Sequence, residues 1–310
     1  MQFPYVFVDG EFVALDDARL SVHANGLHYG TGTFEGIRAF WDGGAMWMLA
    51  AVDHYERMHR SARILGFQLG YSVQELVDAS AQLVRKNEVR EDAYLRPLLV
   101  LGTETLQVRV HDLKPRLSIA ITPMGLNYID PKGVRCMVSS WRRTPDLALP
   151  NRAKVTGGYI GPAMAKSEAL RCGADEAIML NMDGHVAEAS TSNIFVRFGS
   201  TWYTPPLHDD ILEGITRSEL FALIDEVLHE RVVERSIDRS ELYAADEILL
   251  CGTAALVVPV ISVDERAIGG GSAGERTLNL QRTLLAIARR QDPRHPEWTV
   301  KVDLSLSHRA

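Results

Sequence analysis

The sequence predicts a protein of mixed helices and strands, of the α+β or α/β class, folded into two domains. Its 310 residues exceed the usual length of one domain, and hydrophobic residues make up 46% of them, enough for two cores. Charged residues make up 24%, and together with the apolar share this excludes disordered, coiled-coil and collagen-like chains. The order of the predicted elements divides the chain into an N-terminal and a C-terminal part.

The N-terminal part alternates hairpins with helices. Asp9-Gly10 marks a tight turn between two short strands, and Ser72 with Glu75 forms a capping box at the start of a helix. Strands are predicted at residues 5–8, 11–14, 34–41, 45–49, 93–101 and 116–122, and helices at 53–65 and 72–87. These elements predict a small antiparallel α+β domain over residues 1–122.

A segment rich in Pro, Gly and Asn, residues 123–133, interrupts the pattern. Such a composition is typical of a linker, so we predict an interdomain loop here and a larger domain over residues 134–310. Within that domain, strands are predicted at residues 134–140, 176–181, 194–196 and near 232, 247 and 257, and helices at 161–171, 215–231 and 277–290.

Composition and charge limit the classes of partner. A net charge of −7 gives no positive field for a nucleic-acid backbone, and no apolar run is long enough to span a membrane. The N-terminus has no signal-peptide pattern, and Cys136, Cys172 and Cys251 do not form the even set of a disulfide framework. We therefore expect a cytoplasmic protein whose partners are neither nucleic acids nor membranes.

Several common sites are excluded by their spacing. The chain has no glycine-rich phosphate-binding loop ending in Gly-Lys-Ser/Thr and no HExxH helix, and Gly30, Gly32 and Gly36 lack the spacing of a dinucleotide fingerprint. The ten histidines show no ligand spacing with carboxylates, so no metal site is expected.

Lysine is scarce, which narrows the search for an amine nucleophile. Only six of the 33 basic residues are lysines. Lys154 is followed by Gly157 and Gly158, small residues that let a flat ring approach the backbone, whereas the other five lie on charged helix faces, in turns or in the tail. A structural lysine remains an equally good interpretation of this spacing alone.

Two segments have the pattern of an anion-binding turn. In LLCGTAA, Gly252, Thr253 and Ala254 turn after a strand, which brings N–H groups and a hydroxyl together. In LEGITRSEL, Gly214 precedes a helix whose first N–H groups and Thr216 lie at the positive end of the helix dipole. Each segment alone is more typical of an ordinary turn or helix cap than of an anion-binding site.

Six motifs follow one another along the chain: HYGTGTFEGIRAF, AYLRPL, RAKVTGGY, AEASTSNIF, EGITRSEL and CGTAA. In this order and spacing the chain resembles the branched-chain aminotransferase family, the pyridoxal-phosphate enzymes of fold type IV, over about residues 5–300. The resemblance implies a small N-terminal α+β domain and a larger C-terminal domain with a pseudo-barrel sheet.

The resemblance also implies a role for each matching residue around pyridoxal 5′-phosphate. Lys154 corresponds to the catalytic lysine that binds this cofactor covalently, Glu188 to the carboxylate on its pyridine nitrogen, and Tyr159 to the tyrosine that hydrogen-bonds its 3-oxygen. The residues that correspond to the phosphate site are Arg57, Gly214, Ile215, Thr216, Gly252 and Thr253. Without the resemblance, Glu188 and Arg57 are typical of exposed charged side chains.

The substrate site is implied in the same way. Tyr94 and Arg96 alternate with Leu95 on a strand, so both side chains face one side, where the family binds carboxylates. Further residues resemble the family's α-carboxylate turn (Thr253, Ala254), its side-chain pocket (Phe34, Gly36, and Tyr29 across a dimer interface) and a residue that orients the pocket wall (Arg38).

The implied activity is ping-pong transamination of L-leucine, L-isoleucine and L-valine with 2-oxoglutarate, by a homodimer or higher homo-oligomer. Two stretches depart from the family pattern: Gln107 stands where a glycine is usual, and residues 124–127 lack the expected Trp and Tyr. They keep open a related enzyme that accepts D-amino acids or (R)-amines. An aminodeoxychorismate lyase and a catalytically silent phosphate-binding protein are more distant alternatives.

Overall fold

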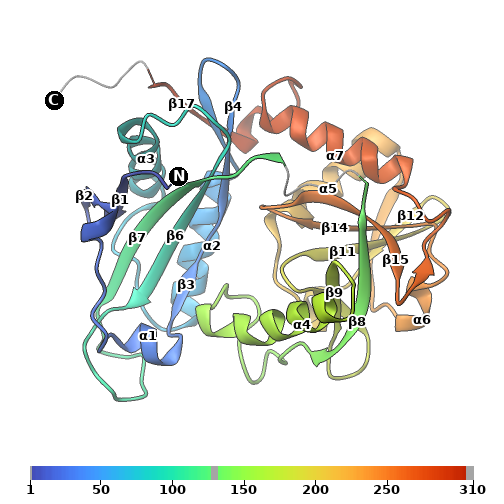
Figure 1. The fold of residues 1–310 in the computed structure, drawn as a ribbon, viewed down its shortest axis with the longest axis horizontal. Helices are drawn as coiled ribbons and strands as arrows, with labels where there is room; N and C mark the ends of the chain where they lie inside the picture. Colours follow the sequence, from blue (N-terminus) through green and yellow to red (C-terminus); the bar gives the residue numbers. More distant parts are fainter. Residues whose placement is uncertain (1, 127–131, 305–310) are drawn as a thin grey trace. The chain divides into compact units, whose positions relative to one another are not determined.

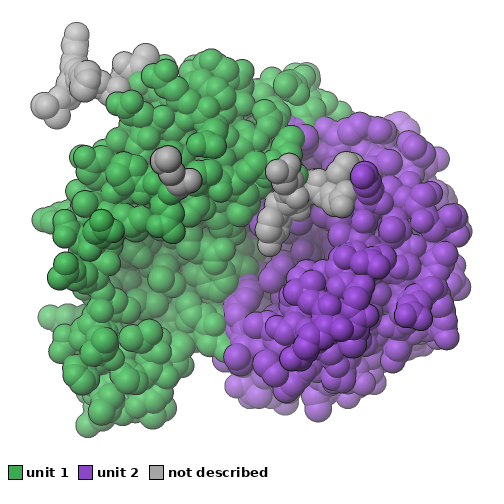
Figure 2. Space-filling model, viewed as in Figure 1, with its two compact units in different colours: residues 1–126, 153–157, 286–310 green, residues 127–152, 158–285 purple. Residues whose placement is uncertain are grey.

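A computed structural model describes residues 2–126 and 132–304 of the protein, and the chain divides into two compact units (Figures 1 and 2). Unit 1 comprises residues 1–126, 153–157 and 286–310, and unit 2 comprises residues 127–152 and 158–285. The units interleave along the chain, so the short segment that contains Lys154 is part of unit 1.

The predicted domains are contiguous stretches of chain, whereas the compact units are not. The boundaries of the domains stay a prediction. Of the predicted loop 123–133, residues 127–131 lie outside the described residues.

Unit 1 is built on an antiparallel eight-stranded sheet with the helices α2 (Ala51–Ile64) and α3 (Val73–Lys86) (Figure 1). The strand order is β17-β5-β4-β6-β7-β1-β2, and β3 pairs with β6. The strand bounds are β1 (Tyr5–Val8), β2 (Glu11–Ala14), β3 (Gly32–Phe34), β4 (Ile37–Trp41), β5 (Met46–Leu49), β6 (Ala93–Leu101), β7 (Pro115–Pro123) and β17 (Thr299–Val302). A short helix, α1 (Asn25–Tyr29), precedes β3.

The core of unit 1 forms between the sheet and the two helices. Tyr55, Met58 and Ala62 recur at helical spacing on α2 and are buried in one cluster with Leu76 and Leu83 of α3. The predicted capping box is confirmed, because the Ser72 hydroxyl accepts from the Glu75 N–H and the Glu75 carboxylate accepts from the Ser72 N–H. The first hairpin and both helices are likewise found where they are predicted.

The single strand predicted over residues 34–41 is wrong, because the structure has β3 and β4 with Glu35 and Gly36 between them. Both short strands pair with β6, and the break between them lies opposite Pro97. A proline has no N–H to donate to the ladder. The Glu35 N–H still donates to the Pro97 carbonyl at 2.8 Å. This interruption carries the Glu35 side chain into the interior, where it is fully buried.

Unit 2 is built on a mixed nine-stranded sheet with order β10-β9-β8-β15-β14-β11-β12-β13, and β16 pairs with β15. The strand bounds are β8 (Val134–Arg142), β9 (Glu176–Leu180), β10 (Val186–Ala189), β11 (Asn193–Phe198), β12 (Thr201–Thr204), β13 (Arg231–Glu234), β14 (Glu247–Gly252), β15 (Leu256–Val263) and β16 (Arg266–Ala267). The helices are α4 (Ile160–Arg171), α5 (Ile215–Leu223), α6 (Arg239–Leu242) and α7 (Glu275–Ala288), and Figure 1 shows the curled sheet.

The core of unit 2 lies along this sheet. Ile178, Ile194, Ile248 and Val260, from four of the strands, are buried in one cluster that also contains Leu242 of α6. The strands predicted in this part are present, and so are the helices predicted over residues 161–171 and 277–290. The strands β10 and β12 were not predicted.

The helix predicted over residues 215–231 is wrong in its second half. α5 ends at Leu223, a π-helical turn follows (Ile224–Leu228), and His229 takes a left-handed conformation with φ 54°. The chain then enters β13, and the buried Glu230 accepts from the Trp202 indole N–H at 2.8 Å. These tertiary contacts override the helical periodicity of the sequence.

Within the residues that the structure describes, no helix is long and apolar enough to cross a membrane. The same residues contain no cluster of three or more His, Cys, Asp or Glu side chains that could hold a metal ion.

Candidate active site

The backbone of Lys154 is fixed to unit 1 by three hydrogen bonds. Its N–H donates to the Ser61 hydroxyl at 3.1 Å, and its carbonyl accepts from the Thr33 hydroxyl at 2.9 Å and from the Phe34 N–H at 3.2 Å. The Lys154 ammonium group lies 4.9 Å from the centroid of the Phe34 ring. The main chain at Lys154 is thus fixed, while the four-carbon side chain presents its amine against an aromatic face.

A close glycine contact holds the same segment. The Gly157 N–H donates to the Gly30 carbonyl at 3.1 Å, and the Thr156 hydroxyl donates to that carbonyl at 2.6 Å. Gly30 has φ +63°, and a Cβ there would lie 2.6 Å from the Gly157 Cα. Both glycines are therefore needed for the segment that carries Lys154 to approach the start of β3.

Helix α2 presents Arg57 to a buried carboxylate. Arg57 Nε donates to Glu35 Oε1 at 2.8 Å, and Arg57 Nη2 donates to Glu35 Oε2 at 2.7 Å. His54, one turn earlier on α2, shares Glu35 Oε2 through its Nδ1 at 2.7 Å. All three side chains are buried, with exposed fractions of 0% for Glu35, 1% for His54 and 3% for Arg57.

The charges of these three groups are set by their contacts. Burial alone raises the pKa of Glu35, but the charge and hydrogen bonds of Arg57, with the hydrogen bond from His54, outweigh it and hold that pKa far below its ordinary value. Burial lowers the pKa of His54 despite its hydrogen bond to Glu35. At neutral pH the group therefore contains an ionised carboxylate, a guanidinium and a neutral imidazole that donates from Nδ1.

Arg96 and Tyr94 share one face of β6, as their alternation predicts. Arg96 Nη2 donates to the Tyr94 hydroxyl at 3.3 Å, and the Arg96 guanidinium lies 4.7 Å from the Phe34 ring centroid. Gly36 faces the same hydroxyl, because a Cβ on Gly36 would lie 1.7 Å from Tyr94 Oη. The structure thus brings Phe34, Gly36, Tyr94, Arg96 and Lys154 together in unit 1.

Arg38 and Tyr29 make other contacts in this unit. Arg38 is fully buried, its Nη2 donates to the Gly125 carbonyl at 3.5 Å, and its guanidinium lies 5.0 Å from the Phe40 ring centroid. Tyr29 on α1 donates to the Leu106 carbonyl at 2.6 Å. Arg38 therefore contacts the chain at Gly125, and the orienting role that the resemblance implies stays a prediction.

In unit 2, Glu188 on β10 is held by donors from three separate segments. Arg143 Nη2 lies 3.0 Å from Glu188 Oε1, while Asn193 Nδ2 and the Leu212 N–H donate to Oε2 at 2.9 and 3.1 Å. Arg143 is itself held by Asn151 at 2.9 Å. The Glu188 side chain is only 8% exposed, so the prediction of an exposed side chain from the bare sequence does not apply to it.

The two predicted anion-binding segments lie in unit 2. Gly214 is the N-cap of α5, and the next two residues, Ile215 and Thr216, form its first turn. A Cβ on Gly214 would lie 1.9 Å from Asn193 Oδ1, the amide that also holds Glu188. Gly252 ends β14 at its pairing with Leu256, so the intervening residues Thr253 and Ala254 form the turn to β15.

Tyr159 belongs to unit 2, whereas Gln107 and Met124, from the two stretches that depart from the family pattern, belong to unit 1. Tyr159 is half-buried and ends the 3-10 turn Thr156–Tyr159, directly before α4. Gln107 lies on an exposed loop, where its side-chain oxygen accepts from Arg109. Met124 donates its N–H to the Asp92 carbonyl at 2.9 Å, and residue 127 of that stretch lies outside the described residues.

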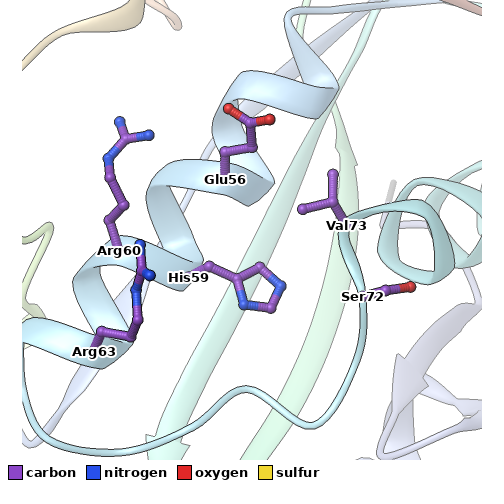
Figure 3. A pocket seen from close by; sticks show the side chains of 6 residues that line it. All are labelled: Glu56, His59, Arg60, Arg63, Ser72 and Val73. Carbon is purple, nitrogen blue, oxygen red and sulfur yellow. The ribbon is translucent and has the colours of Figure 1, made fainter.

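A separate pocket of about 420 Å³ lies between α2 and the start of α3 (Figure 3). Its lining residues are Glu56, His59, Arg60, Arg63, Ser72 and Val73, and Figure 3 shows the His59 ring directed from α2 toward Ser72. These α2 residues occupy the face opposite to the one that carries His54, Arg57 and Ser61. The pocket is therefore not part of the candidate active site.

Several residues that hold the site were not predicted from the sequence: Glu35, His54, Ser61, Arg143 and Asn193. Glu35 offered a signal, because it lies inside the motif that contains Phe34 and Gly36. His54 and Ser61 offered a weaker one, because they share a helix face with Arg57. Asn193 offered the same kind of signal as Glu35, because it lies inside the motif that contains Glu188. Arg143 offered none, since its contact with Glu188 depends on the fold.

Known proteins are similar to this chain over most of its length. The family model described as amino-transferase class IV matches residues 32–263. A probable branched-chain-amino-acid aminotransferase of Aquifex aeolicus is 43% identical over 301 residues, 96% of each chain.

Solved structures are similar over nearly the whole chain. The branched-chain aminotransferase of Thermoproteus uzoniensis with norvaline is 40% identical with a TM-score of 0.92, covering 96% of this chain and 99% of the other. The branched-chain amino acid aminotransferase of Thermobaculum terrenum, in its PLP-containing holo-form, is 31% identical with a TM-score of 0.91, covering 97% of this chain and 99% of the other.

Proposed function

The chain belongs to the class IV aminotransferase family, and from this premise we propose that it exchanges amino groups between branched-chain L-amino acids and 2-oxoglutarate with bound pyridoxal 5′-phosphate. The predicted family, fold class and aminotransferase activity are confirmed by the matches described above. One observation carries the substrate proposal: two cationic groups lie close to the Phe34 ring. The Lys154 amine is 4.9 Å and the Arg96 guanidinium 4.7 Å from the centroid of that ring.

The described side chains fit the cofactor. Unit 1 offers an amine at Lys154 and a buried guanidinium at Arg57, and unit 2 offers a buried carboxylate at Glu188. The first turn of α5 and the turn after β14 add N–H groups and hydroxyls. Gly214 lets the Asn193 amide approach the first of these turns, because a Cβ there would lie 1.9 Å from Asn193 Oδ1. We propose that Arg57, Thr216 and Thr253 hold the phosphate group, Glu188 the ring nitrogen and Tyr159 the ring oxygen.

When bound, pyridoxal phosphate acts as an electron sink for the amino acid's Cα. Lys154 supplies the amine that holds the cofactor and then moves a proton at its Nζ from the substrate Cα. Because the main chain of Lys154 is fixed, its Nζ can move only as far as the lysine side chain allows. The same amine can therefore both remove the proton and deliver it. Glu188, with Arg143 as its counter-charge at 3.0 Å, presents a negative charge to the ring nitrogen.

Unit 1 suits substrates of two kinds. Phe34 and Tyr94 form an apolar surface for an aliphatic side chain, and Arg96 lies over both rings, at 4.7 and 5.2 Å, with a charge for a second carboxylate. An aliphatic amino acid needs the apolar surface, and 2-oxoglutarate needs the positive charge of Arg96. These three residues together support branched-chain amino acids as amino donors and a dicarboxylate as amino acceptor.

We further propose that the protein acts as a cytoplasmic homodimer. Exposed apolar side chains lie on the segments that meet at the hydrogen bond from Tyr29 to the Leu106 carbonyl: Leu27, Leu106 and Val108 are 60%, 62% and 81% exposed. A group of this kind is typical of an association surface, and burying it against a second copy supports the predicted contribution of Tyr29 across the dimer interface. Sedimentation velocity tests the association, and a monomer at micromolar concentration contradicts it.

A single-turnover panel tests the proposed activity. Protein loaded with pyridoxal phosphate is mixed in separate reactions with L-leucine, L-glutamate, D-alanine and (R)-1-phenylethylamine, and the carbonyl product is measured. We expect 2-oxo acids from the two L-amino acids in amounts equal to the sites. Product from D-alanine or the (R)-amine alone contradicts the proposal and favours the alternative that Gln107 keeps open.

A further inference from the structure

We infer that Glu35 is a positioning residue for cofactor binding, which holds the Arg57 guanidinium in the orientation that receives the phosphate group. The inference rests on the proposed function, because it assumes that Arg57 binds that phosphate. Glu35 itself is fully buried and acts through its partners.

The geometry of the pair explains how the orientation is set. Glu35 grips the edge of the guanidinium formed by Nε and Nη2, at 2.8 and 2.7 Å. Because the guanidinium is planar and rigid, engaging this edge fixes the plane of the group and directs Nη1 away from Glu35. A second ligand of Arg57 is therefore directed to the end of the guanidinium formed by Nη1 and the other N–H of Nη2.

His54 fixes the carboxylate in turn. Its Nδ1 donates to Glu35 Oε2 at 2.7 Å, and the same oxygen accepts from Arg57 Nη2. The Glu35 N–H is tied to Pro97 at 2.8 Å. The carboxylate is thus held by its own backbone and by a ring, so it serves as a fixed support for Arg57.

The same helix face links this support to the reactive lysine. Arg57 and Ser61 are four residues apart on α2, and the Ser61 hydroxyl accepts from the Lys154 N–H at 3.1 Å. Glu35 also follows Phe34 directly, and the Phe34 N–H donates to the Lys154 carbonyl. Helix α2 and residues 34–35 therefore position both Arg57, which receives the phosphate, and Lys154, which binds the ring.

Unit 2 contains a matched control. Glu230 is buried, and it accepts from Arg197 Nε and Nη2 at 3.0 and 2.7 Å and from the Trp202 ring N–H at 2.8 Å. Glu230 thus resembles Glu35 in accepting from an arginine edge and one ring N–H, and it has Arg276 Nε as an additional partner at 3.6 Å. No residue of this second group is assigned to the cofactor site.

The test compares pyridoxal phosphate with pyridoxal, which lacks the phosphate group. Dissociation constants for both are measured by titrating the cofactor-free protein, for the wild type, Glu35→Gln and Glu230→Gln. In Glu35→Gln an amide N–H faces donors of Arg57 or His54, so the orientation of the guanidinium is lost. We expect its preference for pyridoxal phosphate over pyridoxal to fall on the order of tenfold, with the affinity for pyridoxal unchanged, and Glu230→Gln to keep the preference.

The outcomes separate this inference from the proposed function. A wild-type protein with no preference for pyridoxal phosphate contradicts both. A clear wild-type preference that Glu35→Gln retains or strengthens, or an equal loss of affinity for both compounds, overturns the inference alone. If Glu35→Gln does not fold, His54→Leu carries the test, because it removes the donor to Glu35 Oε2, and an unchanged preference in that variant overturns the inference.

Discussion

Each compact unit contains a buried glutamate for which we propose a role in cofactor binding, and the two glutamates are held differently. Glu35 in unit 1 accepts from two side chains of a single helix, His54 and Arg57. Glu188 in unit 2 is held by a side chain beyond β8, a side chain at the start of β11 and the Leu212 backbone.

The difference separates two uses of a buried carboxylate. Glu35 is fully buried between β3 and β4 and serves to hold other groups in place. Glu188 retains an exposed fraction of 6% and lies on β10, the end strand of its sheet, which suits a group that contacts the cofactor itself. We therefore expect substitution of Glu188 to affect turnover first, and substitution of Glu35 to affect cofactor binding and stability first.

Lys154→Ala has the largest expected effect because it removes the proposed reactive amine itself. We expect kcat to fall by about four orders of magnitude, the upper range for losing a general acid–base group. Steady-state formation of L-glutamate from 2-oxoglutarate and L-leucine measures it. Lys166→Ala is the matched control, since Lys166 pairs with Glu176 at 2.7 Å outside the candidate site, and it should keep wild-type kcat. Full turnover by Lys154→Ala contradicts the assignment of the reactive amine.

Glu188→Gln tests the direct role of the second carboxylate. The amide keeps the size of the side chain but removes the negative charge next to Arg143, so we expect kcat to fall by about 10²–10³-fold. The affinity for pyridoxal phosphate should fall less than kcat does. A variant that loses cofactor affinity but keeps kcat at saturating cofactor would show that Glu188, like Glu35, only positions other groups.

Glu35→Gln tests the supporting role through stability. Removing the charge leaves Arg57 buried without its counter-ion, so we expect the free energy of unfolding at pH 7 to fall by about 3–5 kcal/mol. Urea unfolding of the cofactor-free protein measures it.

The same variant has a predictable pH dependence. Because the folded-state pKa of Glu35 is lowered, its ionised form stabilises the fold fully above the ordinary value of 4.5, and this contribution is lost as pH falls below it. The stability difference between wild type and Glu35→Gln should therefore shrink below pH 4.5. A difference that stays constant from pH 7 down to pH 3 contradicts the ion pair as its source.

Arg96→Gln has the smallest expected effect and tests whether unit 1 selects the acceptor. Losing a charge-assisted hydrogen bond costs about 1.5–3 kcal/mol, so KM for 2-oxoglutarate should rise about 10–100-fold while KM for L-leucine changes little. Arg135→Gln, at an exposed pair with Asp175, is the control. An equal rise in both KM values indicates a general loss of packing over Phe34 instead of carboxylate recognition.

The sequence predicted the elements that have a strong local signal. The capping box at Ser72, the Asp9-Gly10 turn and the apolar spacing of α2 all depend on residues close together in the chain, and each is present in the structure. The helix extended to residue 231 failed because the π-turn and the left-handed His229 are fixed by contacts with the sheet.

The candidate site shows the same limit. Lys154 and Arg57 were recognisable from motifs, whereas Arg143 reaches Glu188 only because β8 and β10 flank β9. Glu35 was visible inside a motif, but an acidic residue in a strand pattern is typical of an exposed position. Its full burial depends on the break opposite Pro97, which the alternation of residues 34–41 does not reveal.

Transfer of ¹⁵N tests the central proposal most directly. The protein is loaded with pyridoxal phosphate and incubated with L-[¹⁵N]leucine and 2-oxoglutarate, and L-glutamate is analysed by mass spectrometry. We predict L-[¹⁵N]glutamate in amounts equal to the 2-oxo acid derived from leucine, and no transfer by Lys154→Ala. Formation of the 2-oxo acid without labelled glutamate, or no reaction of L-leucine at all, would contradict a branched-chain aminotransferase activity.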